Sequence, residues 1–268
     1  MNITMIEPGE KQLIGFDADI TNSPLGDVIC LTSIPENVYK TYGIKLIDMH
    51  KIWAFNNNPY VLRDIIPEKT LNFSEVLTEF GQKRNRMDIS SQTSSLSDLY
   101  CKTFNMKMFL RHPRLYRFEN NIPDGNSIAI HTTSKGRDSS RVGPIPLNIL
   151  EHIYDTYKEF KIFQVGGVDD FKIDRPNVID KTGLCFLDTA EIISKCGMYI
   201  GVNSGHIHLA NCYPRTKKKL LLFADEWLST MIPQDYSTKS RGGWIDFNWS
   251  YYNTTDDDIG VTMSFLKI

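Results

Sequence analysis

The sequence lacks several features that would define whole classes of protein. Its 268 residues hold no apolar run near the roughly 20 residues that a membrane-spanning helix needs. The N-terminal residues have no basic region followed by an apolar core, so they do not form a signal peptide. The net charge of −2 gives no global field that would draw the chain to nucleic acid or to an anionic membrane. These absences predict a soluble protein of the cytoplasm.

Metal-binding and disulfide patterns are also scarce. The five cysteines are odd in number, widely spaced and without a Cys-x-x-Cys pair, which disfavours a zinc site and predicts reduced, buried thiols. One pair, Asp17 and Asp19, has the Asp-x-Asp spacing of some metal-dependent transferases. It lies upstream of the loop that carries the best catalytic candidate, so we expect no metal site, although the sequence alone leaves a metal role for this pair open.

The C-terminal half alternates between short apolar runs and stretches with helical spacing. The apolar runs predict strands at residues 127–131, 161–165, 177–180, 198–200 and 220–223. The stretches with helical spacing predict helices at residues 147–154 and 187–196. Strands that alternate with helices imply a parallel sheet with both faces covered. This half is therefore predicted to be a doubly wound α/β domain, whose ligands bind beyond the carboxyl ends of its strands.

The N-terminal half is less regular. Strands are predicted near residues 12–16, 45–49 and 51–55, a helix within 27–42, and a polar loop or flap over 82–97. The turn sequence Pro123-Asp124-Gly125-Asn126 marks a link between domains. We expect a first domain over residues 1–122, a second domain over 123–250, and a segment over 251–268 that returns to the first domain.

Residues 201–210, Gly-Val-Asn-Ser-Gly-His-Ile-His-Leu-Ala, are the most informative stretch. They follow an apolar run typical of a strand and lead into a short helical segment. Small residues at such a turn leave backbone N–H groups directed at open space, which suits a phosphate or diphosphate. The same pattern also fits an ordinary strand-to-helix connection whose glycines only serve turn geometry. The local sequence leaves both interpretations open.

Two further segments contain groups that suit the same chemistry. Asp27, in Ser23-Pro24-Leu25-Gly26-Asp27-Val28, has the side chain of a general base that takes a proton from a hydroxyl, but Asp at this point also commonly caps a helix. Residues 131–137, His-Thr-Thr-Ser-Lys-Gly-Arg, combine hydroxyls and two cations in one loop after a predicted strand. They fit an anion cradle or a solvated polar loop.

Taken together, these segments resemble the bacterial heptosyltransferases, a family of two-Rossmann-domain (GT-B) glycosyltransferases. Leu25-Gly26-Asp27-Val28 is similar to the family's N-terminal Leu-Gly-Asp-Val element. His131-Thr132-Thr133 with Lys135 resembles its phosphate-binding loop, and Gly166-Gly167 with Asp169 resembles its Gly-Gly-Pro-Asp-Glu turn. Residues 204–210 match its Ser/Thr-Gly-x-x-His-Leu-Ala signature. The resemblance covers about residues 25–223.

The resemblance implies an inverting, metal-independent transfer of a sugar from a nucleotide diphosphate sugar, which is a co-substrate rather than a cofactor. Asp27 would be the general base. The expected diphosphate contacts are Thr132, Thr133, Lys135, Arg137, Ser204, Gly205 and His206. His208 and Glu226 would support the site or contact the donor nucleoside. The resemblance does not distinguish a hexosyl-, heptosyl- or pentosyltransferase.

Departures from the family pattern concern the donor more than the fold. Asn203 stands where the family usually has an acidic residue, and His206 stands where proline is common. The family's Phe-Gly-Pro-Thr after the last strand is replaced by Phe-Ala-Asp-Glu at residues 223–226. The chain is also short for the family, so we expect a reduced N-terminal domain.

The acceptor is predicted from a basic cluster formed by Arg111, Arg114 and Arg117. These cations suit an anionic acceptor, first of all a bacterial surface saccharide or glycolipid. A viral DNA-base glycosyltransferase, with nucleic acid as the acceptor, is an alternative of the same class. A non-catalytic module that binds a nucleotide sugar without turnover is an alternative of another class.

Overall fold

The chain is described from a computed structural model that defines residues 13–17, 25–72, 113–133, 147–172, 174–202, 204–224 and 248–253, together with 101, 105–107, 109–110 and 145. It divides into two compact units. Unit 1 holds the described residues up to Arg117, and unit 2 holds those from Phe118 onward. The boundary lies close to the predicted link between the domains.

Unit 1 is built on a parallel sheet in the order β3-β2-β1-β4 within the described residues. Its strands are β1 (Ile14–Asp17), β2 (Leu46–Asp48), β3 (Val61–Leu62) and β4 (Lys69–Asn72). Ile14 and Phe16 are fully buried, as alternate residues of a central strand with a covered face should be. The predictions of strands near 12–16 and 45–49 are confirmed, whereas β3 and β4 carry too few apolar residues to be recognised by their pattern.

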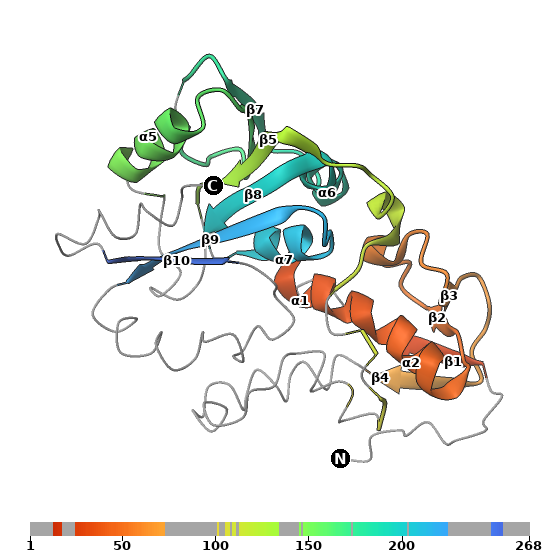
Figure 1. Ribbon diagram of the computed structural model, residues 1–268. Coiled ribbons are helices and arrows are strands. Elements are labelled where there is room, and N and C mark those ends of the chain that lie inside the picture. The colour runs from red at the N-terminus through yellow and green to blue at the C-terminus, as the bar shows by residue number, and fades with distance from the viewer. Residues whose placement is uncertain are drawn as a thin grey trace. The chain divides into compact units, whose positions relative to one another are not determined.

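A helical rod follows β1, made of α1 (Leu25–Cys30), η1 (Leu31–Ser33) and α2 (Ile34–Tyr42) (Figure 1). The rod changes to a 3-10 turn just before Pro35, because proline has no N–H to donate and its ring crowds the carbonyl one turn earlier. It ends at Gly43, which has a left-handed conformation (φ 76°) and donates its N–H to Tyr39 O. The predicted helix within residues 27–42 is confirmed.

The predicted strand at residues 51–55 is wrong, since Trp53–Phe55 form the short 3-10 helix η2. The reason is local: the Asp48 carboxylate at the end of β2 accepts the N–H of Ile52 at 3.1 Å and thereby closes a turn. Arg63 donates to the other Asp48 oxygen at 3.0 and 3.1 Å and so fixes the same turn from the next segment. A polar side chain just before the apolar run therefore decided its conformation.

Unit 2 contains a parallel sheet in the order β10-β9-β8-β5-β6-β7. Its strands are β5 (Asp124–His131), β6 (Lys161–Gly166), β7 (Val178–Thr182), β8 (Cys196–Val202), β9 (Lys217–Ala224) and β10 (Asn248–Asn253). Its helices are α5 (Leu147–Thr156), α6 (Phe186–Lys195) and α7 (Gly205–Asn211). The chain starts in the middle at β5, builds one edge through β7 and then returns to β8. This is the strand order of a doubly wound dinucleotide-binding domain, so the predicted α/β fold class is confirmed.

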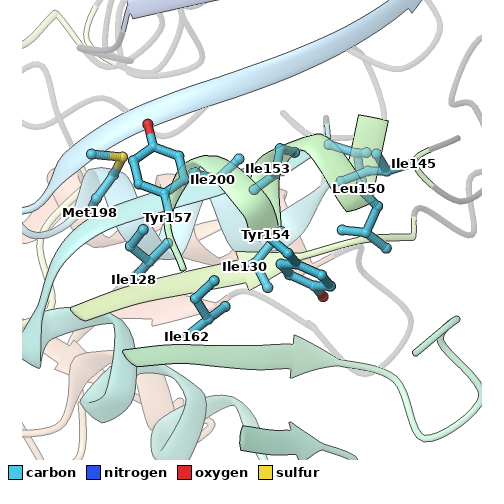
Figure 2. Close-up of a cluster of buried hydrophobic side chains, with 11 residues drawn as sticks. Ile128, Ile130, Ile145, Leu150, Ile153, Tyr154, Tyr157, Ile162, Met198 and Ile200 are labelled. Carbon is cyan, nitrogen blue, oxygen red and sulfur yellow. The ribbon is translucent and has the colours of Figure 1, made fainter. Parts of the chain in front are cut away.

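The core of unit 2 lies between α5 and one face of this sheet (Figure 2). Alternate residues of the central strands point to this face, with Ile128 and Ile130 from β5 and Ile200 from β8 all fully buried. Leu150 and Ile153 of α5 pack against them at helical spacing. Buried positions with a period of two in the strands and about three to four in the helix are what made this half readable from sequence.

The remaining structural predictions have mixed outcomes. β10 pairs with β9, so residues 251–253 belong to the sheet of unit 2, and the predicted return of 251–268 to the first domain stays a prediction for the residues beyond 253, which lie outside the description. All five cysteines are free; four are buried as expected, but Cys185 is exposed. Among the described residues, no helix combines the length and apolar character needed to cross a bilayer. The predicted loop at 82–97 lies outside the described residues.

Candidate functional site at the carboxyl edge of unit 2

The candidate site lies at the topological switch point of the unit 2 sheet. The strand order reverses between β5 and β8, which run side by side with His131 opposite Gly201. β5 ends at His131, and β8 leads through residue 203 to Ser204 and then to α7. Ligands of open parallel sheets bind outside the carboxyl ends of the strands at such a point. The structure therefore brings together two of the three segments singled out in the sequence.

His131 joins three turns of this edge. Its Nδ1 lies 2.9 Å from Ser204 Oγ, and its Nε2 lies 3.4 Å from the Asp170 carboxylate, which follows β6. The side chains of His131 and Asp170 are 4% and 3% exposed. Asp170 also accepts the backbone N–H of Gly167 at 2.8 Å. We call His131, Asp170, Ser204 and His206 the His131 cluster.

His206 completes the cluster by stacking on His131. The two rings lie with their centroids 4.0 Å apart at an angle of 28°. Burial, and secondly the neighbouring His131, hold the pKa of His206 well below its usual range, so this ring is neutral. The N–H of His206 donates to Ser204 Oγ at 3.3 Å, which makes Ser204 the cap of α7. His206 thus adds an aromatic contact to the end of β5.

Gly166 makes this packing geometrically feasible. Its φ of +136° is accessible to glycine but rarely to other residues. A Cβ at this position would lie 2.1 Å from an Asp170 oxygen and 2.7 Å from His131 Cδ2. The first glycine of the Gly166-Gly167 pair therefore gives His131 and Asp170 the space to approach each other.

The two threonines after β5 differ in how far their hydroxyls are exposed. Thr132 is fully buried, and its hydroxyl donates to Phe171 O at 3.1 Å. The same carbonyl accepts the amide of Gln164 at 2.6 Å, so Thr132 fastens the end of β5 to the segment after β6. Thr133 is only half-buried, with its hydroxyl 3.4 Å from that of Thr132. Of the pair, Thr133 has the hydroxyl with access to a ligand.

Sequence reasoning missed two features of this edge. The sequence motif pointed to Asp169, whereas its neighbour Asp170 is the buried aspartate that contacts His131 and accepts the N–H of Gly167. Val168, Leu184 and Phe186 are apolar yet exposed by 68%, 37% and 42%. Gly183 sits against Val168, and the Phe186 ring lies 6.3 Å from that of His206. Apolar side chains that gather at strand ends beside a polar cluster are typical of a ligand site, but their sequence positions give no such signal.

The other predicted site residues are not gathered here. Asp27 lies in unit 1, as the third residue of α1, and its side chain is outside the description. His208 is a half-buried residue of α7, and Arg117 is exposed in unit 1. Four predicted site residues lie outside the described residues, namely Arg111, Lys135, Arg137 and Glu226. Their assigned roles stay predictions.

Arg114 has a partner within unit 1. Its Nη1 lies 3.4 Å from the buried Glu36 carboxylate, and its guanidinium carbon lies 4.8 Å from the centre of the Tyr116 ring. Tyr116 donates its hydroxyl to the same Glu36 oxygen at 2.6 Å, and Lys40 pairs with the other oxygen. We call these four residues the Glu36 cluster. Arg114 is therefore a paired, partly exposed cation, and its predicted contact with an anionic acceptor stays a prediction.

Metal ligands do not gather in the described part of the chain, where no group of three or more His, Cys, Asp or Glu side chains has the geometry to hold a metal ion. Asp17, one half of the Asp-x-Asp pair, accepts from His50 Nε2 at 2.7 Å at the carboxyl ends of β1 and β2. Asp19 lies outside the description, so the role of the pair stays open.

The chain is similar to known proteins in its fold but not detectably in its sequence. The sequence matches no protein-family model and no curated protein sequence. Among solved structures it is similar to a glycosyl transferase family 9 protein from Veillonella parvula DSM 2008, with 15% identity, a TM-score of 0.59, and coverage of 95% of this chain and 90% of that one. It is also similar to the iron-containing dodecameric glycosyltransferase TibC from enterotoxigenic E. coli, with 12% identity and a TM-score of 0.50.

The extent of these likenesses differs. The similarity to TibC covers 81% of this chain but only 61% of that protein. A third likeness, to the E. coli ADP-heptose LPS heptosyltransferase II, has 10% identity over 89% of both chains and a TM-score of 0.49, which is too low to argue from. The likeness to the Veillonella protein spans nearly the whole of both chains. The protein therefore has the two-unit α/β fold of a glycosyl transferase family 9 structure.

Proposed function

We propose that the protein is a glycosyltransferase that moves a sugar from a nucleotide diphosphate sugar to an acceptor hydroxyl. The observation that carries this proposal is the meeting of His131-Thr132-Thr133 and Ser204-Gly205-His206 at the switch point between β5 and β8. Both segments are expected to contact the donor diphosphate from their resemblance to the heptosyltransferase motifs. A fold shared with a glycosyl transferase family 9 structure supports the same assignment.

The donor subsite would be assembled from unit 2. Thr133, the Ser204 hydroxyl and the cations Lys135 and Arg137 would contact the diphosphate, while the buried Thr132 holds the end of β5 in place. Charge grows on the diphosphate as the sugar leaves, and fixed donors and cations stabilise it. The exposed apolar side chains Leu184 and Phe186 offer a surface for a nucleoside base at the same edge.

Asp27 would be the general base of the reaction. As the acceptor oxygen attacks the anomeric carbon from the face opposite the diphosphate, its proton passes to the Asp27 carboxylate. The bond from the anomeric carbon to the diphosphate oxygen breaks, and its electron pair leaves with the diphosphate. This single displacement inverts the anomeric configuration and is proposed to need no metal. The proposed acceptor is a surface saccharide or a glycolipid.

Substitution of Asp27 tests the base directly. A thermal-shift screen with ADP, UDP, GDP, CDP and dTDP and their sugars first identifies the donor, because a ligand that binds only the native state raises Tm. Asp27→Asn should then keep donor binding within twofold and lower the transfer rate by about 10²-fold to 10⁴-fold, the usual contribution of a general base. Asp64→Asn is the matched control, since Asp64 is an exposed carboxylate of the same unit.

The outcomes separate the competing interpretations. Transfer that survives in Asp27→Asn at the wild-type rate would reject Asp27 as the base. Tight donor binding without transfer or donor hydrolysis by the wild-type protein would instead favour a non-catalytic nucleotide-sugar-binding module. Retained configuration in the product would contradict the inverting mechanism, and activity that is lost with EDTA and restored by a divalent cation would contradict metal independence.

A further inference from the structure

Tyr199 carries a buried hydroxyl that makes no well-formed hydrogen bond. The residue is fully buried in β8, and its Oη has no hydrogen-bond partner of good geometry among the described residues. Burying a hydroxyl in this way costs free energy, and a phenylalanine would fill the same space without that cost. Such groups are uncommon in folded proteins, and departures of this kind are expected first at functional sites.

The Tyr199 hydroxyl lies at the switch point of the unit 2 sheet. Tyr199 and Gly201 point to the same face of the sheet, opposite to Ile200 and the core beneath α5. A Cβ on Gly201 would lie 2.5 Å from Tyr199 Oη, so the ring runs along β8 toward the residue that pairs with His131. Burial raises the pKa of Tyr199 and the Ser204 hydroxyl lowers it in part, because the two hydroxyls are neighbours.

A second tyrosine shows that burial without a partner does not by itself define a site. Tyr213 is 3% exposed, and its Oη likewise has no hydrogen-bond partner in the part of the chain that the structure describes. It follows α7, at the end of that helix opposite to Ser204. Tyr199 differs from Tyr213 in its neighbour, because Ser204 is the residue whose hydroxyl is expected at the donor diphosphate.

A phosphate at Ser204 would give the Tyr199 hydroxyl a partner. The Ser204 hydroxyl has one proton and two lone pairs, and an ionised phosphate oxygen can only accept. In the structure the Ser204 oxygen lies 2.9 Å from His131 Nδ1 and accepts the N–H of His206 at 3.3 Å. When the Ser204 proton turns to a phosphate, the lone pairs of the same oxygen turn toward the protein, where Tyr199 has a proton to donate. A hydroxyl that accepts a hydrogen bond is a stronger donor, so Tyr199 strengthens the bond from Ser204 to the phosphate.

We propose that Tyr199 is a positioning residue of the donor subsite, whose buried hydroxyl donates to Ser204 Oγ when the Ser204 hydroxyl donates to a donor phosphate. The inference rests on the proposed function, because it requires a phosphate at Ser204. It stands on the complete burial of Tyr199, the contact of its hydroxyl with Gly201 and the position of Ser204 at the switch point. No covalent bond changes in this step, and each proton stays on its own oxygen.

The variant Tyr199→Phe separates a positioning role from a structural one. It removes only the hydroxyl, so urea unfolding should show a protein at least as stable as wild type. Calorimetry with ADP, UDP, GDP, CDP and dTDP identifies the nucleoside diphosphate that binds most tightly. Tyr199→Phe should bind this nucleotide about threefold to tenfold more weakly than wild type, the usual contribution of one hydrogen bond. Tyr213→Phe is the matched control, because it removes another unpartnered hydroxyl from the same unit, and it should keep the affinity within twofold.

A double-mutant cycle with Ser204→Ala tests whether the effect passes through Ser204. Without the Ser204 hydroxyl, Tyr199→Phe should change the affinity by less than twofold. An unchanged affinity in Tyr199→Phe, an equal loss in Tyr213→Phe, or a loss that persists beside Ser204→Ala would overturn the inference, while nucleotide binding by wild type still upholds the donor subsite. An unfolded Tyr199→Phe would overturn it too, because the hydroxyl would then have a structural role. If none of the five nucleoside diphosphates binds, the proposed function falls together with the inference.

Discussion

Each unit buries a polar cluster around one carboxylate, and the two carboxylates have different partners. The Glu36 cluster of unit 1 surrounds one carboxylate with Lys40, Arg114 and the hydroxyl of Tyr116. The His131 cluster of unit 2 gives the Asp170 carboxylate one backbone N–H, from Gly167, and the His131 imidazole as neighbours. Two cations and a hydroxyl compensate the buried Glu36 carboxylate and fix one structure, whereas Asp170 lies at the carboxyl ends of the strands, where ligands of parallel sheets bind. The difference teaches which buried cluster to read as structural and which as functional.

The Glu36 cluster belongs to a longer polar seam. The helical rod of unit 1 presents Thr32, Asn37 and Thr41 to described residues between 107 and 114, which pair with the rod in the opposite chain direction. Asn37 Oδ1 accepts the N–H groups of both Phe109 and Leu110 at 2.8 Å, and its amide donates to Leu110 O at 2.9 Å. Thr32 Oγ1 accepts the N–H of Arg114 at 2.8 Å. These bonds satisfy backbone groups of Phe109, Leu110 and Arg114 that lie outside helices and strands, which is a structural task.

The largest expected effect comes from the backbone beneath the His131 cluster. Gly166→Ala should lower the free energy of unfolding by about 3 to 5 kcal/mol, because backbone strain adds to a clash with Asp170 and His131. Gly43→Ala in unit 1 is the matched control. Gly43 also has a positive φ, but nothing lies within 4 Å of the added Cβ, so the cost should be only about 1 kcal/mol.

Urea unfolding of both glycine variants measures this difference. Nucleotide binding should be lost in Gly166→Ala and kept in Gly43→Ala. Equal destabilisation by the two alanines would show that the space around Gly166 is not required, and the contrast between the units would weaken.

A middle-sized effect is expected from Glu36→Gln. The substitution leaves Lys40 and Arg114 without their carboxylate, but both cations are about two-fifths exposed, so the loss should be about 1 to 2 kcal/mol. Glu191→Gln is the matched control, because Glu191 pairs with a lysine at the same helical spacing but is exposed. It should cost less than about 0.5 kcal/mol.

The stability difference between wild type and Glu36→Gln should also depend on pH. Burial alone would raise the pKa of Glu36, but hydrogen bonds from Lys40 and Tyr116 and the charges of Lys40 and Arg114 outweigh it and lower the pKa. A lowered folded-state pKa stabilises the protein above the ordinary value of 4.5, and this stabilisation is lost as the pH falls through the folded-state value. Urea midpoints of wild type and Glu36→Gln should therefore converge on acidification. A gap that stays constant down to pH 3 would contradict an ionised Glu36.

The smallest effect is expected at the surface of unit 2. A hydrogen bond from Lys172, followed by bonds from the Thr182 N–H and hydroxyl, lowers the pKa of Asp180 to about 2. Lys172→Gln should raise this pKa but leave it below the ordinary 3.8, because both Thr182 bonds persist. The free energy of unfolding should change by less than about 0.5 kcal/mol, as for other exposed pairs. An NMR titration of the Asp180 carboxyl measures the shift, and an unchanged pKa would remove the role given to Lys172.

The sequence predicted much of unit 2 because its strands are short apolar runs separated by helices of clear periodicity. Residues 198–200 were recognised as a strand, and β8 extends that strand to residues 196–202. Unit 1 was less predictable, since β3 has only two residues and the run at 51–55 is apolar like a strand but closed into a turn by Asp48. Periodicity reports burial of side chains, and it carries no information on whether a nearby carboxylate will accept a backbone N–H and close a turn.

The candidate site was likewise predictable from the sequence only in part. The motif around Ser204 and the loop after His131 were visible as small and polar residues at the ends of apolar runs, so the sequence by itself determined the doubly wound domain and the edge at which a ligand should bind. Only the tertiary structure decided that Asp170 rather than Asp169 holds His131, that Thr132 is buried while Thr133 is accessible, and that Arg114 is paired with Glu36. The physical reason is distance along the chain: strand order brings residues 131, 170 and 204 together, and contacts between turns leave no local pattern in the sequence.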